Sequence, residues 1–231
     1  MKRFWKDVAV EREGAQWGVK LDGRPLKTPA RNALVVASKA LADGIAGEWR
    51  SVGETIDPRA MPFTGLANAA TDRVAPDRLA FAAGLTRFAQ ADLACYRAEG
   101  PGALIDRQAE QWDALLGWGR RRYDVDFATT FGLTHVEQPS ATVERLSHAV
   151  LSLDAFQLAG LSPLVTISGS LVAALAVLEK ALTPAQAWAA VTVDDAWQRE
   201  RWGSDAEAET ALENRRRDFF AAAQFLELLD A

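Results

Sequence analysis

The sequence predicts an α+β fold in which a small β-rich N-terminal domain with one helix precedes a larger all-helical domain. Near the N-terminus, the apolar residues Trp17, Val19 and Leu21 occupy every second position, which is the period of a half-buried strand. Beyond a short linker, apolar residues recur at helical spacing to the end of the chain. We therefore place a β-rich α/β domain at residues 1–58 and a helical domain at residues 59–231.

The 231 residues have an ordinary globular composition, 49% hydrophobic and 25% charged, which argues against a disordered chain. A chain of this length buries about 70% of the surface that its unfolded form exposes, so it needs no disulfide or metal for stability. The net charge of -5 argues against nucleic-acid binding through a broadly basic surface. The single cysteine, Cys95, favours a reducing compartment, and His135 and His148 are too few for a histidine-rich metal site.

Short strands account for the first 36 residues. One is predicted over residues 4–10. The dipeptide Asp22-Gly23 then signals a hairpin turn, because both residue types tolerate positive φ. Pro25 and Pro29 bracket the next strand and place it at a sheet edge, since proline has no amide hydrogen to donate. A further short strand is predicted from Leu34 to Val36.

The remaining elements are predicted to be helices. Ser38 can cap the first helix, which runs to about Val52, and Asp57-Pro58 lies in the linker that follows. Thr183 begins another helix as the cap of a capping box, and Gly203 suits its end. The other helices are predicted at residues 62–74, 76–98, 106–123, 142–153, 154–182 (as two helices) and 205–229.

One uncharged stretch, residues 155–178, is long enough to cross a bilayer. It contains Gln157, Pro163, several serines and two glycines, so we interpret it as a pair of buried core helices and expect no membrane insertion. The N-terminus has no apolar run of signal-peptide length, and we expect no targeting segment.

The sequence carries no recognised catalytic signature. It lacks a phosphate-binding P-loop, a dinucleotide-binding glycine pattern, a nucleophile elbow and a His-Glu-x-x-His zinc motif. Two basic runs, Arg120 to Arg122 and Arg215 to Arg217, are interpreted as surface ion-pair partners rather than nucleic-acid contacts.

Acidic residues gather beside two tryptophans near the C-terminus. Four acids and no base occur from Ser204 to Glu213. Two interpretations stay open: the acids favour the N-terminus of a helix through its dipole, or they form a contact surface with Trp197 and Trp202. We expect these two tryptophans near the surface. The other tryptophans are assigned to packing: Trp5, Trp17, Trp49, Trp112, Trp118 and Trp188.

Several long segments, in order along nearly the whole chain, carry a family resemblance. They are Leu21 to Pro29, Glu48-Trp49, Met61 to Thr64, Asp92 to Glu99, Arg107-Gln108, Trp112-Asp113, Gly169 to Val172, and Trp197 to Glu207. Together they resemble the assembly chaperones of the F-type ATP synthase catalytic head, which bind its free α subunit.

The resemblance implies a chaperone rather than an enzyme. We expect no cofactor, and the absence of a P-loop leads us to expect no bound nucleotide. Such chaperones bind the unassembled α subunit, prevent its aggregation and release it when the β subunit arrives. The implied fold is a small α/β N-terminal domain followed by an orthogonal helical bundle. The family is found in mitochondria and in α-proteobacteria, and without a transit peptide this chain is expected to be a bacterial, cytoplasmic member.

The resemblance also gives weight to an acid in the C-terminal region, at positions that match Asp205 and Glu207 here. The family often has an acid directly after Trp-Gly, where this chain has Ser204. We therefore expect Asp205→Lys combined with Glu207→Lys to weaken chaperone action while leaving the fold intact. The expected partner-binding residues are Trp197, Glu200, Trp202, Asp205 and Glu207.

Asp92, Tyr96 and Arg97 are further candidates for partner binding, predicted to lie one turn apart on a helix. Contacts within that helix are the alternative explanation for them.

Two other function classes stay open. One is an enzyme of unknown class that uses Asp92, Cys95, Tyr96 and Arg107 in a helical cleft, and the other is an interaction module with a different partner.

Overall fold

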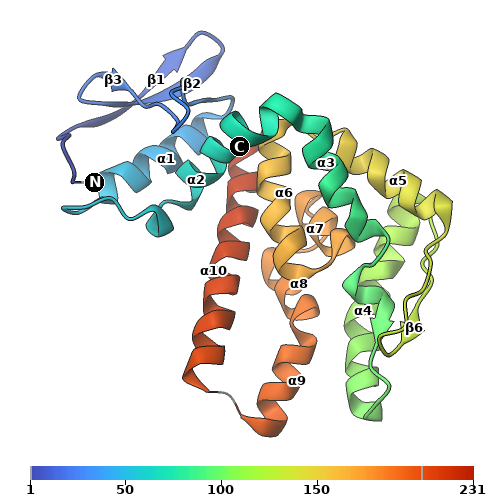
Figure 1. Ribbon diagram of the computed structural model, residues 1–231. Helices are drawn as coiled ribbons and strands as arrows, with labels where there is room; N and C mark the ends of the chain where they lie inside the picture. Colours follow the sequence, from blue (N-terminus) through green and yellow to red (C-terminus); the bar gives the residue numbers. More distant parts are fainter. Residues whose placement is uncertain (1, 204) are drawn as a thin grey trace. The chain divides into compact units, whose positions relative to one another are not determined.

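A computed structural model describes residues 2–203 and 205–231 of the chain (Figure 1). It confirms the α+β class, with a small sheet near the N-terminus followed by helices. The chain divides into two compact units. Unit 1 comprises Met1–Arg78, Asp154–Gly160 and Ala221–Ala231, and unit 2 comprises Leu79–Leu153 and Leu161–Phe220. The proposed domain division at residue 58 stays a prediction.

A four-stranded sheet is the first layer of unit 1. Strand β2 (Gln16–Leu21) is central: it pairs antiparallel with β1 (Val8–Glu13) on one side, and with β3 (Arg24–Pro25) and β4 (Val35–Val36) on the other. The predicted turn between β2 and β3 is present, since Asp22-Gly23 adopts positive φ at both residues.

The predicted first strand begins too early in the sequence. Pairing starts at Val8 rather than Phe4, because the amides of Lys6 and Asp7 donate to the Asp22 carboxylate instead of to a strand. Trp5, just before them, is buried and donates its indole N–H to the carbonyl of Trp49 at 3.3 Å.

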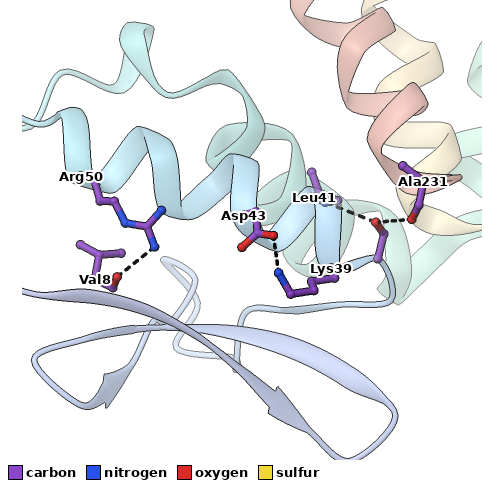
Figure 2. Close-up of polar contacts among 7 residues, drawn as sticks. Val8, Lys39, Leu41, Asp43, Arg50 and Ala231 are labelled. Atoms are coloured by element: carbon purple, nitrogen blue, oxygen red, sulfur yellow. Dashed lines mark hydrogen bonds and ion pairs between the residues drawn. The ribbon is translucent and has the colours of Figure 1, made fainter.

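Helix α1 (Lys39–Ser51) packs on the sheet and completes the core of unit 1. Its predicted cap is confirmed, because Ser38 Oγ accepts a hydrogen bond from the amide of Leu41 at 3.3 Å. Figure 2 shows two further ties: Arg50 donates to the carbonyl of Val8 at 3.1 Å, and the Ser38 hydroxyl donates to the carbonyl of Ala231 at 3.3 Å.

Helix α2 (Pro62–Ala69) begins at a carboxylate supplied by α1. Glu48 accepts hydrogen bonds from the amides of Phe63 and Thr64 and from the Thr64 hydroxyl, at 2.6, 2.8 and 2.6 Å. Burial raises the pKa of the Glu48 carboxyl, while these hydrogen bonds oppose the shift. The turns η1 (Pro58–Ala60), η2 (Ala70–Val74) and η3 (Ala75–Asp77) flank α2.

Unit 2 is helical, apart from one small sheet. Helix α4 (Gly102–Tyr123) buries Trp112 and Leu116 among its neighbours. It contacts α5 (Ser140–Leu151), α7 (Leu171–Leu178), α8 (Pro184–Val191) and α9 (Val193–Trp202).

The uncharged stretch forms the two predicted helices, α6 (Ala155–Ser168) and α7, separated at Gly169, which has a φ of +69°. Residues Leu171 to Val177 of α7 are all buried. Among the described residues, no helix combines the length and the hydropathy required to cross a membrane. The last helix, α10 (Ala206–Leu229), lies close to its predicted position.

The predicted helix over residues 76–98 is wrong beyond its middle. Helix α3 (Arg78–Thr86) is followed by the short turns η4 (Arg87–Ala89) and η5 (Leu93–Cys95). Strand β5 (Tyr96–Arg97) then pairs in parallel with β6 (Thr130–Phe131). Asp92 caps η5, where its carboxylate accepts from the amide of Ala94 and from that of Val172 in α7, both at 3.0 Å.

The helix predicted from Thr183 to Trp202 is also divided. Its start is confirmed by a complete capping box on α8, but α8 ends at Val191 and α9 begins at Val193. The carbonyl of Ala190, which a continuous helix would offer to the amide of Asp194, instead accepts the indole N–H of Trp112 at 2.7 Å.

Candidate functional site

Helices α9 and α10 enclose a groove within unit 2. It consists of two adjoining hollows of about 410 Å³ each, which share the side chains of Asp195, Arg199, Glu209 and Leu212. Trp202, Gly203 and Asp205 line one end of the groove, and Trp188, Glu213 and Arg216 line the other. The groove therefore combines apolar side chains with more acids than bases, and we call it the α9–α10 groove.

Trp202 forms the rim of this groove at the end of α9. The expected exposure is confirmed, since 77% of its surface is accessible. The helix stops directly after it: Gly203 has a φ of +76°, which favours glycine, and its amide donates to the carbonyl of Arg199 at 2.9 Å. A large indole is thus held at a fixed helix end with most of its surface free to contact a partner.

Asp205 lines the same end of the groove and caps α10. Its carboxylate accepts from the amide of Ala208 at 2.7 Å, and its carbonyl accepts from that of Glu209 at 3.0 Å. Glu207 is exposed in the first turn of α10. The helix-terminus interpretation of these acids is therefore confirmed in geometry, and their role in partner binding stays a prediction. Ser204 lies outside the described residues.

The expected surface position of Trp197 is wrong, because only 5% of this side chain is accessible. The guanidinium groups of Arg107 and Arg201 lie 5.2 and 4.7 Å from its ring centroid. One of the sequence neighbours that suggested exposure, Arg201, thus stacks on the indole together with Arg107 from α4, because an arginine can stack on an aromatic ring and keep its charge in water.

Glu200 faces α4 through an ion pair with Arg107, at 2.9 Å between Nη1 and Oε1. The hydrogen bond from Arg107 lowers the pKa of the Glu200 carboxyl. Nearer the start of α9, Asp194 accepts from the buried side-chain amide of Gln108 at 2.7 Å. Glu200 therefore helps to hold α9 on α4.

The structure gives the remaining candidates, Asp92, Tyr96 and Arg97, three different sets of contacts. Asp92 is buried, and its carboxylate accepts a hydrogen bond from the amide of Val172 in the first turn of α7. Burial raises the pKa of this carboxyl. Arg97 is also buried, and it pairs with Asp113 at 2.7 Å. The Tyr96 hydroxyl lies 3.2 Å from Nδ1 of His135. Asp92 and Arg97 therefore stabilise the fold of unit 2, and the predicted arrangement of these residues on one helix is wrong.

The side chains proposed for an enzymatic cleft, among them Cys95, Asp92 and Arg107, are each buried or bound to other groups of the fold. Cys95 is fully buried, and burial raises the pKa of its thiol to about 12, so the reactive thiolate is scarce at neutral pH. Asp92 is engaged by backbone amides and Arg107 by Glu200. Among the residues described, no group of three metal-binding side chains is found.

Both basic runs form surface ion pairs, as predicted. In the first run, Arg120 pairs with Asp126 at 3.7 Å. In the second, Arg215 of α10 pairs with Asp195 of α9 at 3.6 Å, and Arg216 pairs with Glu213 of its own helix at 3.3 Å.

Sequence reasoning missed Arg199 and Leu212 as groove residues. Both side chains line the groove, one from α9 and the other from α10. Their alignment depends on how the two helices pack, and the only local signal was the apolar Leu212 close to charged residues.

Comparisons with known proteins give one consistent result. The model of the ATP12 chaperone protein family matches residues 2–120. The mitochondrial atp12 protein of Schizosaccharomyces pombe is 28% identical, over 88% of this chain and 74% of that protein.

Solved structures agree with this result. The Atp12 structure from Paracoccus denitrificans superposes with a TM-score of 0.94 at 40% identity, covering 99% of this chain and 98% of that one. An aspartate-to-lysine mutant of the same Atp12 gives the same TM-score and identity. The Atu1473 protein from Agrobacterium tumefaciens has a TM-score of 0.94 at 37% identity, over 99% of this chain and 86% of that one.

Proposed function

The chain belongs to the ATP12 chaperone family, and we propose that it binds the unassembled α subunit of the F-type ATP synthase and keeps it from aggregating. It is an assembly chaperone of the ATP synthase rather than an enzyme, in keeping with its family and relatives. The step that the proposal adds is the identity of the client as the α subunit.

A physical argument supports a binding role of this kind. A subunit that awaits its neighbours exposes apolar surface, and large exposed apolar patches aggregate. A chaperone that binds only the native-like form stabilises it by mass action, by about 2.7 kcal/mol at a concentration one hundred times the dissociation constant. Because no P-loop occurs in the sequence, we propose that competition from the β subunit releases the client.

We propose the α9–α10 groove as the client-binding site. The observation that carries this assignment is Trp202, which stands 77% exposed on the rim of a hollow that Asp205 and Glu209 also line. Tryptophan is one of the residue types enriched in interface hot spots. Of the residues expected at the site, Trp202, Asp205 and Glu207 remain proposed contacts. Trp197 and Glu200 instead contact Arg107 of α4 and so help to hold α9 in place.

The test measures capture of purified α subunit by the full chain and by the variant Trp202→Ala. We expect the dissociation constant to rise by a factor of about 30 or more, because truncation of a hot-spot tryptophan costs about 2 kcal/mol or more. Leu133→Ala is the matched control, since Leu133 is 99% exposed but lies on the loop after β6.

Two results would contradict the proposal in different ways. If the wild-type chain fails to bind or protect the α subunit, the assignment of the client is wrong. If it binds the α subunit and Trp202→Ala binds equally well, the client stands and the groove is rejected as the site.

We also propose a bacterial, cytoplasmic location for this chaperone. The structures that it resembles come from Paracoccus denitrificans and Agrobacterium tumefaciens, and the curated relative is mitochondrial. A reducing compartment is compatible with the single, buried cysteine. Fractionation of the source cell with an antibody against the full chain tests the location.

A further inference from the structure

The N-terminal segment has a charge opposite to that of the whole chain. Residues 1–31 contain eight lysines and arginines against four aspartates and glutamates, whereas the chain has 26 against 31. Four of these cations are exposed in segments that meet at the β2–β3 turn or in the loop that follows β3. These four, which we call the basic loop cluster, are Lys6, Arg24, Lys27 and Arg31.

The carboxylate next to the first two cations is occupied by backbone amides. Asp22 Oδ1 accepts from the amides of Lys6 and Asp7 at 3.0 and 2.8 Å, and these hydrogen bonds lower the pKa of the Asp22 carboxyl. Asp22 therefore fixes the turn and brings the Lys6 segment to it. The side chains of Lys6 and Arg24 extend from a turn whose shape is already set.

A second carboxylate shapes the loop that carries Arg31. Asp72 accepts from the Thr28 hydroxyl, the amide of Ala30 and the side-chain amide of Asn32, at 2.7, 2.9 and 2.9 Å. Within the loop, the amide of Arg31 donates to the carbonyl of Thr28 at 2.8 Å. Asp72 thus uses its oxygens on the loop's own donors and holds the loop in one conformation.

Arg31 occupies a backbone conformation that its residue type disfavours. Its φ is +69°, in the left-handed region where glycine and asparagine are the usual residues. Backbone requirements therefore do not explain an arginine at this position. Strain of this kind is found where a particular side chain is needed at a particular place.

Two other cations of unit 1 have a carboxylate within ion-pair distance, and in the part of the chain that the structure describes the members of the basic loop cluster do not. Lys20 pairs with Glu11 at 2.5 Å and Lys39 with Asp43 at 2.6 Å. In residues 2–203 and 205–231, no ion pair within 4 Å joins any member of the basic loop cluster to a carboxylate. The charge of Asp22 reaches Lys6 and Arg24 from beyond ion-pair distance, and all four cations remain exposed to a carboxylate of another molecule.

The segment Leu21 to Pro29, one of those that carry the family resemblance, contains both buried residues and exposed cations. Leu21, Leu26 and Thr28 are buried and serve the fold. Arg24 and Lys27 are exposed within the same segment, so their charges face the solvent rather than the core.

We propose that the basic loop cluster is a second contact surface, which docks on a carboxylate-rich patch of the client subunit. The proposal rests on the proposed function, since it takes the α subunit as the client. Exposed and pre-organised cations attract an acidic surface and raise its association rate. The loop exposes no large apolar side chain in residues 22–33 that could enter a bilayer, and the chain as a whole is acidic, so a protein surface is favoured.

The experiment compares two variants of the full chain with equal net charge. The cluster variant carries Arg24→Ser, Lys27→Ser and Arg31→Asn, in which asparagine tolerates the backbone conformation of residue 31. The control variant loses three exposed cations elsewhere in unit 1, through Lys2→Ser, Arg12→Ser and Arg59→Ser. Thermal unfolding establishes that both variants are folded.

Binding of purified α subunit is measured at low and high salt. At low salt, the dissociation constant of the cluster variant should rise roughly tenfold, because each exposed ion pair changes affinity a few-fold. The control should change less than about twofold, and salt should weaken the wild type more than the cluster variant. Carbodiimide cross-linking should join Lys6 or Lys27 to carboxylates of the α subunit.

The possible results lead to different conclusions. If the wild type captures the α subunit and the two variants bind it equally well, the second surface is rejected while the proposed function stands. If the wild type does not capture the α subunit, both proposals are wrong. If the cluster variant loses affinity only for vesicles of anionic phospholipid, or only for RNA, the acidic protein partner is overturned.

Discussion

At the scale of single residues, Asp205 combines a structural task with a proposed binding task. Its carboxylate caps α10 through the amide of Ala208, and it also lines the α9–α10 groove. The double substitution to lysine suggested by the sequence would thus remove a cap and place positive charge at a helix N-terminus. A loss of chaperone action in that variant would not distinguish the two tasks.

Asp205→Asn separates the cap from the charge. The asparagine oxygen can still cap α10, so we expect an unchanged melting temperature and a dissociation constant for the α subunit that rises about two- to fivefold. Asp205→Ala should instead lower the free energy of unfolding by about 1 kcal/mol, since the cap is lost. Wild-type affinity in the asparagine variant would reject the negative charge as a binding determinant.

Glu48 gives a pH-dependent prediction at the same scale. Burial raises the pKa of its carboxyl above the ordinary value for a glutamate. The folded state therefore holds this proton more tightly than the unfolded state does. Stability from the protonated form is present below the unfolded-state pKa and is lost as pH rises through the folded-state pKa.

Glu48→Gln removes this titration while keeping a similar shape. The free energy of unfolding of the wild type, relative to the variant, should fall as pH rises from about 4 to 7. Urea unfolding at several pH values measures this difference. A difference that grows with pH would show that the hydrogen bonds from Phe63 and Thr64 outweigh burial.

Two tryptophans of α9 show where the sequence predicts the exposure of a side chain and where it does not. Trp202 is exposed as expected, and it ends a helix directly before a glycine. Trp197 was expected near the surface and is buried, because Arg107 lies ninety residues away in sequence and still stacks on it. Charged neighbours in the sequence do not distinguish a tryptophan in water from one beneath an arginine.

At the scale of elements, helix starts were predictable and interruptions were not. The starts at Ser38 and Thr183 are encoded within four residues, and the structure has both caps. The break between α8 and α9 depends on Trp112, which is 78 residues from its acceptor Ala190. A tertiary contact of that kind overrides a helical pattern that is locally continuous.

Trp112→Phe tests whether this contact supports the break. The variant keeps an aromatic ring but leaves the buried carbonyl of Ala190 without its 2.7 Å hydrogen bond. We expect the free energy of unfolding to fall by about 1–3 kcal/mol, measured by urea titration. Hydrogen exchange at residues 190–196 should show weakened protection around the α8–α9 junction.

The control for this variant is Trp118→Phe, since Trp118 is a half-buried tryptophan of the same helix. It loses an indole of the same size without touching the carbonyl of Ala190. If both substitutions cost the same free energy of unfolding, the hydrogen bond from Trp112 makes no special contribution to the break.

At the scale of the whole molecule, the two proposed surfaces carry charges of opposite sign. The α9–α10 groove belongs to unit 2 and contains more acids than bases, whereas the basic loop cluster belongs to unit 1. A client that contacts both would need a basic patch and an acidic patch. A partner engaged in this way has its register and orientation restricted, since the wrong pairing of patches is repulsive.

Combining the two sets of substitutions tests whether the surfaces act separately. If the groove and the cluster contact different parts of the α subunit, the fold-changes of Asp205→Asn and of the cluster variant should multiply in the combined variant. Equivalently, their free energies should add within about 0.5 kcal/mol. Titration calorimetry of all four proteins with the α subunit provides the cycle. A combined effect much smaller than the product would show that the two sites share one energetic contribution and would contradict a client held at two independent surfaces.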